Sequence, residues 1–134
     1  MNLTWVDLNL KSDTRGDLIP VESEKDLPFA MKRVYFIRKT PTDARRGFHA
    51  HHQLNQVALC LVGQCDFLMD DGTNKQTATL KADSKALLIP PMIWHEMSNF
   101  SSDCLLAVFA SDLYDESDYI RTYEDFLREV KRAK

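Results

Sequence analysis

The 134-residue sequence lacks both an excess of basic residues and a long apolar run. Its 17 Lys and Arg residues are outnumbered by 20 Asp and Glu residues, which gives a formal net charge of −3. Nucleic-acid-binding proteins need surplus cations to neutralise phosphates, so this balance argues against a nucleic-acid partner. No apolar stretch reaches the ~18 residues that cross a bilayer, and Met1–Leu10 has neither the basic start nor the apolar core of a signal peptide. We therefore expect a soluble, cytoplasmic protein with no membrane partner.

Cysteine is scarce as well, and its number is odd. Cys60 and Cys104 lie in apolar runs, and Cys65 makes three, so we expect buried, unpaired thiols in a reducing compartment. The sequence has no low-complexity segment, linker or internal repeat. Its length and ordinary composition predict a single domain over residues 1–134.

Short apolar runs separated by turn residues make up most of the chain. Gln56–Val62 is apolar on both faces, which is typical of a central strand, and the Asp-Asp-Gly-Thr of Asp70–Thr73 is a hairpin signal. The spacing of roughly 8–12 residues predicts an all-β protein, an antiparallel sandwich or barrel. The runs with strand character are Trp5–Leu10, Leu18–Val21, Ala30–Arg38, Gly47–His51, Gln56–Val62, Cys65–Met69, Gln76–Leu80, Ala86–Ile89, Trp94–Phe100 and Cys104–Ala110.

Only the C-terminal end has a helical pattern. Asp115 to Ser117 offer N-caps, and apolar residues recur at helical spacing from Tyr119 to Val130. We expect an amphipathic helix over about 116–132 that packs against the outside of the sheet.

Three of the four histidines fall within four positions. In a strand, His49 and His51 project from one face and His52 from the other. Two imidazoles on one face of a small barrel are costly to bury without partners. They indicate either a metal site or an acid–base pair, since imidazole titrates near neutral pH. The alternative without a function is a solvated rim.

The residues downstream have the spacing of the cupin barrels. His49-x-His51 is followed after four residues by Gln56 and after six more by Gly63, and a second motif runs over Pro90–Asn99. The sequence resembles the cupins in these two motifs. The resemblance implies a cupin (RmlC-like) jelly roll, here with a C-terminal α-helix.

Three departures from the cupin pattern bear on a metal. Met92 replaces the glycine of the second motif, and Ser84 stands where an earlier glycine is expected. Gln56 replaces the usual glutamate, so a three-histidine site would lack the anionic oxygen that helps to hold a hard divalent ion. Three histidines alone can still bind Zn²⁺. We favour a site without metal.

A closer resemblance covers nearly the whole chain. The segments DTRGDLIPVE, PFAMKRVYFIR, RRGFHAHHQLNQVALCLVGQC and PPMIWHEMSNFSSDCLLAVFASDLYDESDYIRTYEDF resemble the dTDP-sugar 3,4-ketoisomerases, the small WxcM-like cupins. This resemblance implies an isomerase that acts on dTDP-4-keto-6-deoxy-D-glucose with no metal or other cofactor. It also implies a homodimer that exchanges N-terminal strands, in which Trp5–Leu10 adds to the partner's sheet.

The implied reaction moves a carbonyl from C4 to C3 of the sugar. A base removes the C3 proton, an enediol(ate) forms, and a proton returns to C4. The resemblance places both histidines of the HxH stretch in the site. We expect His49 to be the base and His51 its proton-shuttling partner, although the two roles could be reversed. Tyr35 is a candidate donor to the sugar oxygen, with an ordinary core position as its alternative.

The diphosphate needs fixed cations, and arginine binds two oxygens with its planar fork. Arg33 and Arg46 are the candidates beside the expected pocket, with Arg15 reaching from the N-terminal turn. For each, a solvated surface arginine is the alternative.

Three more residues of the two motifs are candidates for the substrate site. Trp94 is expected near the nucleotide, although a core position is nearly as plausible. His95 is expected to touch the sugar or its acid–base partners, and Gln56 to orient one imidazole in place of a metal.

Two other classes of function stay open at this point. One is a metal-dependent cupin, either a dioxygenase or an isomerase, and the other is a sugar-nucleotide-binding cupin without catalysis. Within the resemblance, the galacto product is favoured over the gluco epimer. That product would supply 3-amino-3,6-dideoxyhexose synthesis for a lipopolysaccharide O-antigen or an S-layer glycan.

Overall fold

The computed structural model describes residues 1–83 and 85–134. Ser84, the departure from the cupin glycine pattern, lies outside the described residues. In the described part of the chain, no helix is long and apolar enough to span a bilayer.

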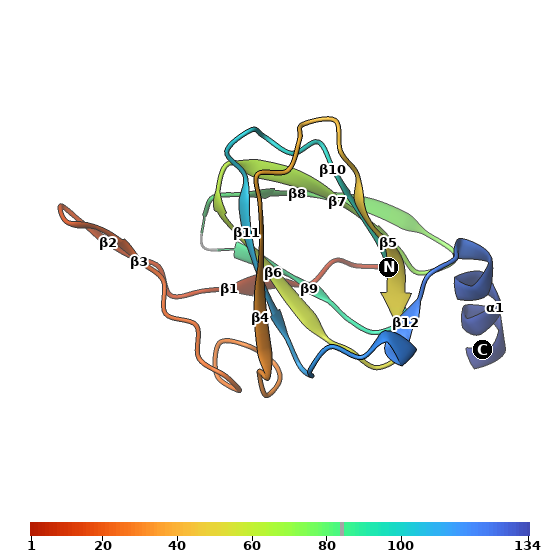
Figure 1. Ribbon diagram of the computed structural model, residues 1–134. Coiled ribbons are helices and arrows are strands. Elements are labelled where there is room, and N and C mark those ends of the chain that lie inside the picture. Colours follow the sequence, from red (N-terminus) through yellow and green to blue (C-terminus); the bar gives the residue numbers. More distant parts are fainter. Residues whose placement is uncertain (84) are drawn as a thin grey trace.

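Two antiparallel sheets face each other and form the jelly roll that the sequence predicts (Figure 1). One sheet has the strand order β1-β9-β6-β11-β4 and the other has the order β12-β5-β10-β7-β8, while β2 and β3 form a separate hairpin. The elements are β1 (Trp5–Asp7), β2 (Lys11–Asp13), β3 (Gly16–Leu18), β4 (Arg33–Arg38), β5 (Arg46–His51), β6 (Gln56–Val62), β7 (Gln64–Asp70), β8 (Lys75–Lys81), β9 (Lys85–Ile89), β10 (Trp94–Ser98), β11 (Leu105–Ala110), the 3₁₀ turn η1 (Glu116–Asp118), β12 (Tyr119–Ile120) and α1 (Tyr123–Ala133).

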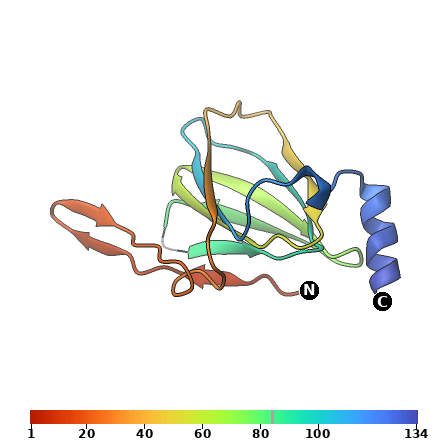
Figure 2. The ribbon, with the colours of Figure 1, turned by 60° about the horizontal axis from the view of Figure 1, so that its bottom comes forward.

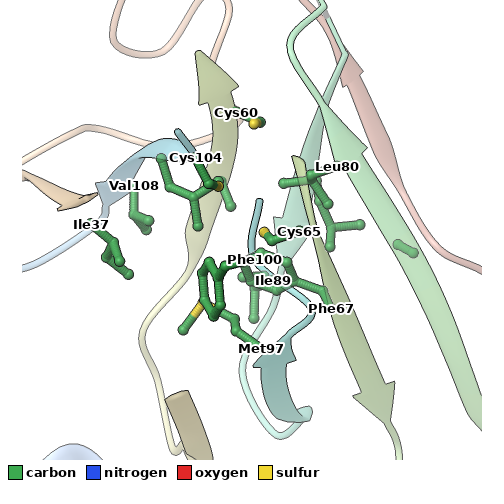
Figure 3. Packing of buried hydrophobic residues seen from close by; sticks show 14 of the residues in the cluster. Ile37, Cys60, Cys65, Phe67, Leu80, Ile89, Met97, Phe100, Cys104 and Val108 are labelled. Carbon is green, nitrogen blue, oxygen red and sulfur yellow. The ribbon is translucent and has the colours of Figure 1, made fainter. Parts of the chain in front are cut away.

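The main core lies between the two sheets, because alternate side chains of each strand point inward. Figure 3 shows part of this core, with Cys65 near Phe67 and with Cys60 and Cys104 farther from Met97. Cys60, Cys65 and Cys104 are buried and unpaired, as predicted. Burial raises the pKa of the Cys60 thiol to about 12, so this thiol does not supply a thiolate near neutral pH.

The predicted central strand β6 is buried on both faces. Ala58 points into the main core, whereas Val57 and Leu59 pack on the outer face against Leu27 and the segment around it. Its neighbours are β9 and β11. The apolar residues on both faces of β6 are therefore explained by its central position, as the sequence indicated.

The helix begins later than the sequence predicts. Asp115 caps only the short turn η1, and Thr122 is the true N-cap, accepting the backbone N–H of Asp125 at 3.2 Å. The residues between pair with β5, where Tyr119 lies opposite His51. The expected start at 116 is therefore wrong, because tertiary pairing to β5 takes the first residues of the periodic run. As predicted, α1 packs on the outside of a sheet, through the buried Phe126.

The N-terminal segment differs from expectation in two ways. β1 pairs with β9 of the same chain, with Trp5 opposite Leu87, so the expected addition of this strand to a partner's sheet is wrong for the described chain. The strand expected at Leu18–Val21 is wrong as well, because β3 ends at Leu18. Gly16, with a φ of 116°, closes a tight turn between β2 and β3. This hairpin projects from the body on the side away from α1 (Figure 2).

Candidate active site

A bulge in β5 sets the direction of the side chains in the candidate site. His49 pairs with His95 of β10, Gly47 pairs with the next β10 residue, and Phe48 lies unpaired between them. Gly47 and Phe48 both have positive φ, 89° and 60°, which fits a bulge that opens on a glycine. In a regular strand Arg46 and His49 would face opposite sides. The extra residue brings them to the same side, where both line one pocket.

Three imidazoles and one phenol gather where β5, β10 and β12 lie side by side (Figure 1). The ring centroid of His49 is 5.0 Å from that of His51 and 4.5 Å from that of His95. Tyr119 packs at 4.9 Å from His49 and at 4.3 Å from His51. His51 and His95 are buried and His49 is half-buried. His52 is exposed and lies outside this cluster, as strand alternation predicts.

Backbone and side-chain acceptors select the tautomers of two rings. Nδ1 of His49 lies 3.1 Å from the carbonyl oxygen of Gly47. Because a carbonyl only accepts, Nδ1 carries the hydrogen in the neutral ring and Nε2 keeps its lone pair. Nδ1 of His51 lies 3.3 Å from a carboxylate oxygen of Asp118 without the geometry of a hydrogen bond, and the negative charge there favours the same tautomer. Both rings therefore present Nε2 as the basic atom.

Burial keeps the three imidazoles neutral at pH 7. Burial is the main cause that lowers the pKa of His49. It lowers the pKa of His51 to about 4, because protonating both His51 and its neighbour His49 is unfavourable as well, while Asp118 opposes the shift. The pKa of His95 falls to about 3, again mainly through burial. Neutral rings with free Nε2 atoms are suited to accept a proton.

Tyr35 and Gln56 are joined by a hydrogen bond. Tyr35, on β4, lines the same pocket as His49. Nε2 of Gln56 donates to its hydroxyl oxygen at 2.8 Å, so the expected contact of Gln56 with an imidazole is wrong. Burial raises the pKa of Tyr35 to about 12, so the phenol is protonated at neutral pH and can donate.

Two of the three candidate cations line the pocket region. Arg33 is half-buried and lines both the pocket of His49 and the adjoining pocket of His51. Arg46 is exposed at the rim of the first. Arg15 is paired with Asp13 at 2.8 Å, lies on the projecting hairpin, and lines neither pocket of its own chain (Figure 2).

Trp94 does not line the pocket region. It is on the other face of β10 from His95, and its ring packs at 5.4 Å from Tyr123 and 5.9 Å from Phe126 (centroid distances). Its indole N–H donates to Glu96 at 2.9 Å. The expected position near the nucleotide is wrong, because Trp94 anchors α1 on the sheet. His95 contacts His49, as expected for a neighbour of an acid–base residue.

Asp118 and Tyr119 were missed by sequence reasoning, which assigned both to the helix. Asp118 accepts the backbone N–H groups of Gln53 and Leu54 at 3.0 and 3.2 Å and lies against His51. Tyr119 lines both pockets. Together they close the site on the β12 side.

The donor set does not fit a metal ion. The amide N–H of Gln56 is turned to Tyr35, and the ring centroids of His51 and His95 are 6.4 Å apart. Over residues 1–83 and 85–134, no three His, Cys, Asp or Glu side chains are arranged to hold one ion.

Comparison with known proteins shows the same family along nearly the whole chain. The family model FdtA, described as WxcM-like, C-terminal, matches residues 1–131. A TDP-4-oxo-6-deoxy-alpha-D-glucose-3,4-oxoisomerase from Aneurinibacillus thermoaerophilus is 48% identical over 120 residues, which are 90% of this chain and 86% of that protein.

Solved structures agree with this match. A mutant of the 3,4-ketoisomerase QdtA from Thermoanaerobacterium thermosaccharolyticum, in complex with TDP-4-keto-6-deoxyglucose, aligns with a TM-score of 0.95 at 37% identity, over 98% of this chain and 95% of that one. The WlaRB TDP-quinovose 3,4-ketoisomerase from Campylobacter jejuni aligns with a TM-score of 0.90 at 42% identity, over 95% and 98%. This chain therefore belongs to the FdtA (WxcM-like) family of TDP-sugar 3,4-ketoisomerases.

Proposed function

We propose that this chain isomerises dTDP-4-keto-6-deoxy-D-glucose to the 3-keto sugar through an enediol(ate). The observation that carries the proposal is the environment of His49. Its Nδ1 is occupied by the Gly47 carbonyl, so Nε2 is basic, and its pocket also contains Arg33, Tyr35 and Arg46. A base, a neutral donor and two cations in one pocket are the groups that proton transfer on a nucleotide-linked keto sugar requires.

The steps balance without a cofactor. Nε2 of His49 takes the C3 proton, which is acidic because it lies next to the C4 carbonyl, and negative charge develops on the C4 oxygen. Tyr35, protonated at neutral pH, donates a hydrogen bond to that oxygen. A proton then moves from the C3 hydroxyl to the C4 oxygen. The proton that His49 has taken, or a solvent proton exchanged for it, passes to Nε2 of His51, which delivers it to C4 and leaves both imidazoles neutral. The substrate gains and loses no electrons, so no redox partner is needed.

The cations of the pocket are assigned to the diphosphate. Arg33 lines the pockets of both histidines, and its Nε has no hydrogen-bond partner among the residues that the structure describes. Arg46 lies at the rim beside it. QdtA, a relative with this fold, has been crystallised with TDP, which supports a TDP-linked substrate here.

We further propose a homodimer in which the projecting hairpin reaches the partner. Val34 and Phe36 on the outer face of β4 are exposed, and Leu18 at the hairpin is 59% exposed. Apolar side chains at an edge strand are typical of a contact with another chain. In such a dimer Arg15 would approach the partner's site rather than its own. Sedimentation analysis tests the dimer, and Phe36→Asp should shift the protein toward the monomer.

The cellular setting is part of the same proposal. Three buried, unpaired cysteines fit the reducing cytoplasm. The product is assigned the galacto configuration and a place before amino transfer in 3-amino-3,6-dideoxyhexose synthesis, for an O-antigen or S-layer glycan. Proton couplings at C4 of the product distinguish galacto from gluco.

Incubation with dTDP-4-keto-6-deoxyglucose in D₂O, followed by NMR, tests the reaction. We expect deuterium at C4 of a 3-keto product and exchange at C3 of the recovered substrate. Binding without exchange would identify a sugar-nucleotide-binding protein instead. Turnover that is lost on chelation and restored by one metal would identify a metal-dependent cupin.

A further inference from the structure

Gln56 is a buried polar side chain in an apolar strand. It is 2% exposed at the start of β6, where Ile89 and Ala110 lie opposite it on the two neighbouring strands. Its Nε2 donates to the hydroxyl of Tyr35, whereas Oε1 has no hydrogen-bond partner among the residues that the structure describes. A buried amide with an unpaired oxygen is destabilising. The one side-chain hydrogen bond of Gln56, to Tyr35, therefore points to a role that offsets this cost.

The direction of this hydrogen bond determines where the Tyr35 proton points. An amide N–H can only donate, so the phenol oxygen accepts. A phenol has one proton, and that proton stays free for another acceptor. Tyr35 lines the pocket that contains Arg33, Arg46 and His49, so the free O–H is available to the sugar in this pocket.

We infer that Gln56 is a positioning residue that keeps Tyr35 as a hydrogen-bond donor to the sugar oxygen. The inference rests on the proposed function, because it assigns Gln56 a role in the same proton transfer. Gln56 itself acts through the phenol and lines neither pocket of the site. The cupin pattern has glutamate at this position. Replacing the amide of Gln56 by a carboxylate would reverse the direction of the hydrogen bond to Tyr35, since a carboxylate only accepts.

A carboxylate at position 56 would only accept. It would take the Tyr35 proton into its own hydrogen bond and leave the phenol without a donor for the substrate. A buried carboxyl group is protonated more easily than an exposed one. When protonated, it can donate to the phenol oxygen as the amide does. The substitution Gln56→Glu therefore changes shape little and makes the role of Tyr35 depend on pH.

The experiment compares kcat and KM of Gln56→Glu, Tyr35→Phe and the double variant between about pH 6 and about pH 9. Tyr35→Phe should lower kcat by about 10²-fold, the usual effect of removing one oxyanion donor. Gln56→Glu should lose little at the acidic end and approach the loss of Tyr35→Phe at the alkaline end. KM should change little, and the double variant should be no worse than Tyr35→Phe. The charged and titratable groups near the Tyr35 hydroxyl are Arg33, Arg46, His49 and Tyr119, and all are unchanged in these variants.

Gln64→Glu provides the matched control. Gln64 is exposed at the start of β7, so this substitution adds the same negative charge away from the site. It should keep the wild-type pH profile. Gln56→Met, which lacks both donor and acceptor, should show a loss that is independent of pH. A pH-independent loss in Gln56→Glu, or losses that multiply in the double variant, would overturn the inference. Failure of the proposed function looks different, since the wild type itself would then show no isomerisation or C3 exchange.

Discussion

Asp118 holds a negative charge 3.3 Å from Nδ1 of His51. The carboxylate is fixed there by the backbone N–H groups of Gln53 and Leu54. It raises the pKa of His51, although burial and the charge of His49 lower that pKa by more. A fixed carboxylate behind an imidazole orients the ring and stabilises its protonated form.

The first prediction follows from this pair. Asp118→Asn removes the charge that raises the His51 pKa, so this pKa falls further and less of the ring is protonated at any given pH. Proton return to C4 should slow by about tenfold for each pKa unit lost, and the alkaline limb of the kcat profile, along which His51 loses its proton, should move to lower pH. Asp125→Asn, an exposed aspartate on α1, is the control. An unchanged pH profile in Asp118→Asn would remove His51 from the proton path.

The second prediction concerns the bulge. A Cβ at Gly47 would lie 2.9 Å from the backbone oxygen of His95, at a φ of 89°. Gly47→Ala should therefore destabilise the fold by about 1–3 kcal/mol and lower kcat, because it displaces His49 and Arg46 together. Gly16 also has a positive φ, but a Cβ there would meet nothing within 4 Å. Gly16→Ala should therefore lose less stability in thermal unfolding, and its loss measures the cost of the backbone conformation without the steric clash. Equal losses in the two variants would contradict the steric argument.

The third prediction concerns the nucleotide. Arg33→Ala and Arg46→Ala should each weaken dTDP binding by about 1.5–3 kcal/mol, the usual value of a charge-assisted hydrogen bond. Calorimetric titration measures this directly. Arg45→Ala, the exposed neighbour of Arg46 in the sequence, should bind as the wild type does. If neither of the first two variants loses affinity, the diphosphate binds elsewhere.

The fourth prediction concerns metal. The amide of Gln56 donates to Tyr35, and it supplies no anionic oxygen to a hard divalent ion. Turnover should survive exhaustive chelation, and elemental analysis of the active protein should find far less than one metal per chain. Stoichiometric Zn, Fe or Mn together with chelator-sensitive turnover would contradict this.

The strands were predictable because the inward-facing residues of a strand are apolar and recur at every second position, which can be seen in the sequence. β6 matches its expected bounds of Gln56–Val62, and the expected hairpin at Asp70–Thr73 joins β7 to β8. One departure from the cupin pattern lies at a position with the backbone conformation that favours glycine. Met92 replaces the glycine and still adopts a φ of 60°, a conformation that costs a side chain energy and that glycine adopts freely.

The site was harder to predict, since its residues meet only through tertiary pairing. Asp118 and Tyr119 share the helical period of the residues that follow, so periodicity assigned them to a helix. One local signal was available: Thr122 with Asp125 three residues later fits the capping-box pattern of a Ser or Thr followed by an acidic residue. The position of Trp94 depends on α1 covering the outer face of β10, which no local pattern indicates.

The last prediction separates the roles of the three neighbouring histidines. His49 and His51 face the site, whereas His52 is exposed outside it. A general base typically supplies 10²–10⁴-fold in rate, so His49→Asn should lose isomerisation by about that factor and with it C3 exchange. Its dTDP affinity should stay near the wild-type value, because the ring moves a proton and does not bind phosphate. His51→Asn should lose turnover but keep part of the C3 exchange if it serves the second transfer. His52→Asn should behave as the wild type. Full C3 exchange in His49→Asn with none in His51→Asn would reverse the two roles, and loss of activity in His52→Asn alone would contradict the site as a whole.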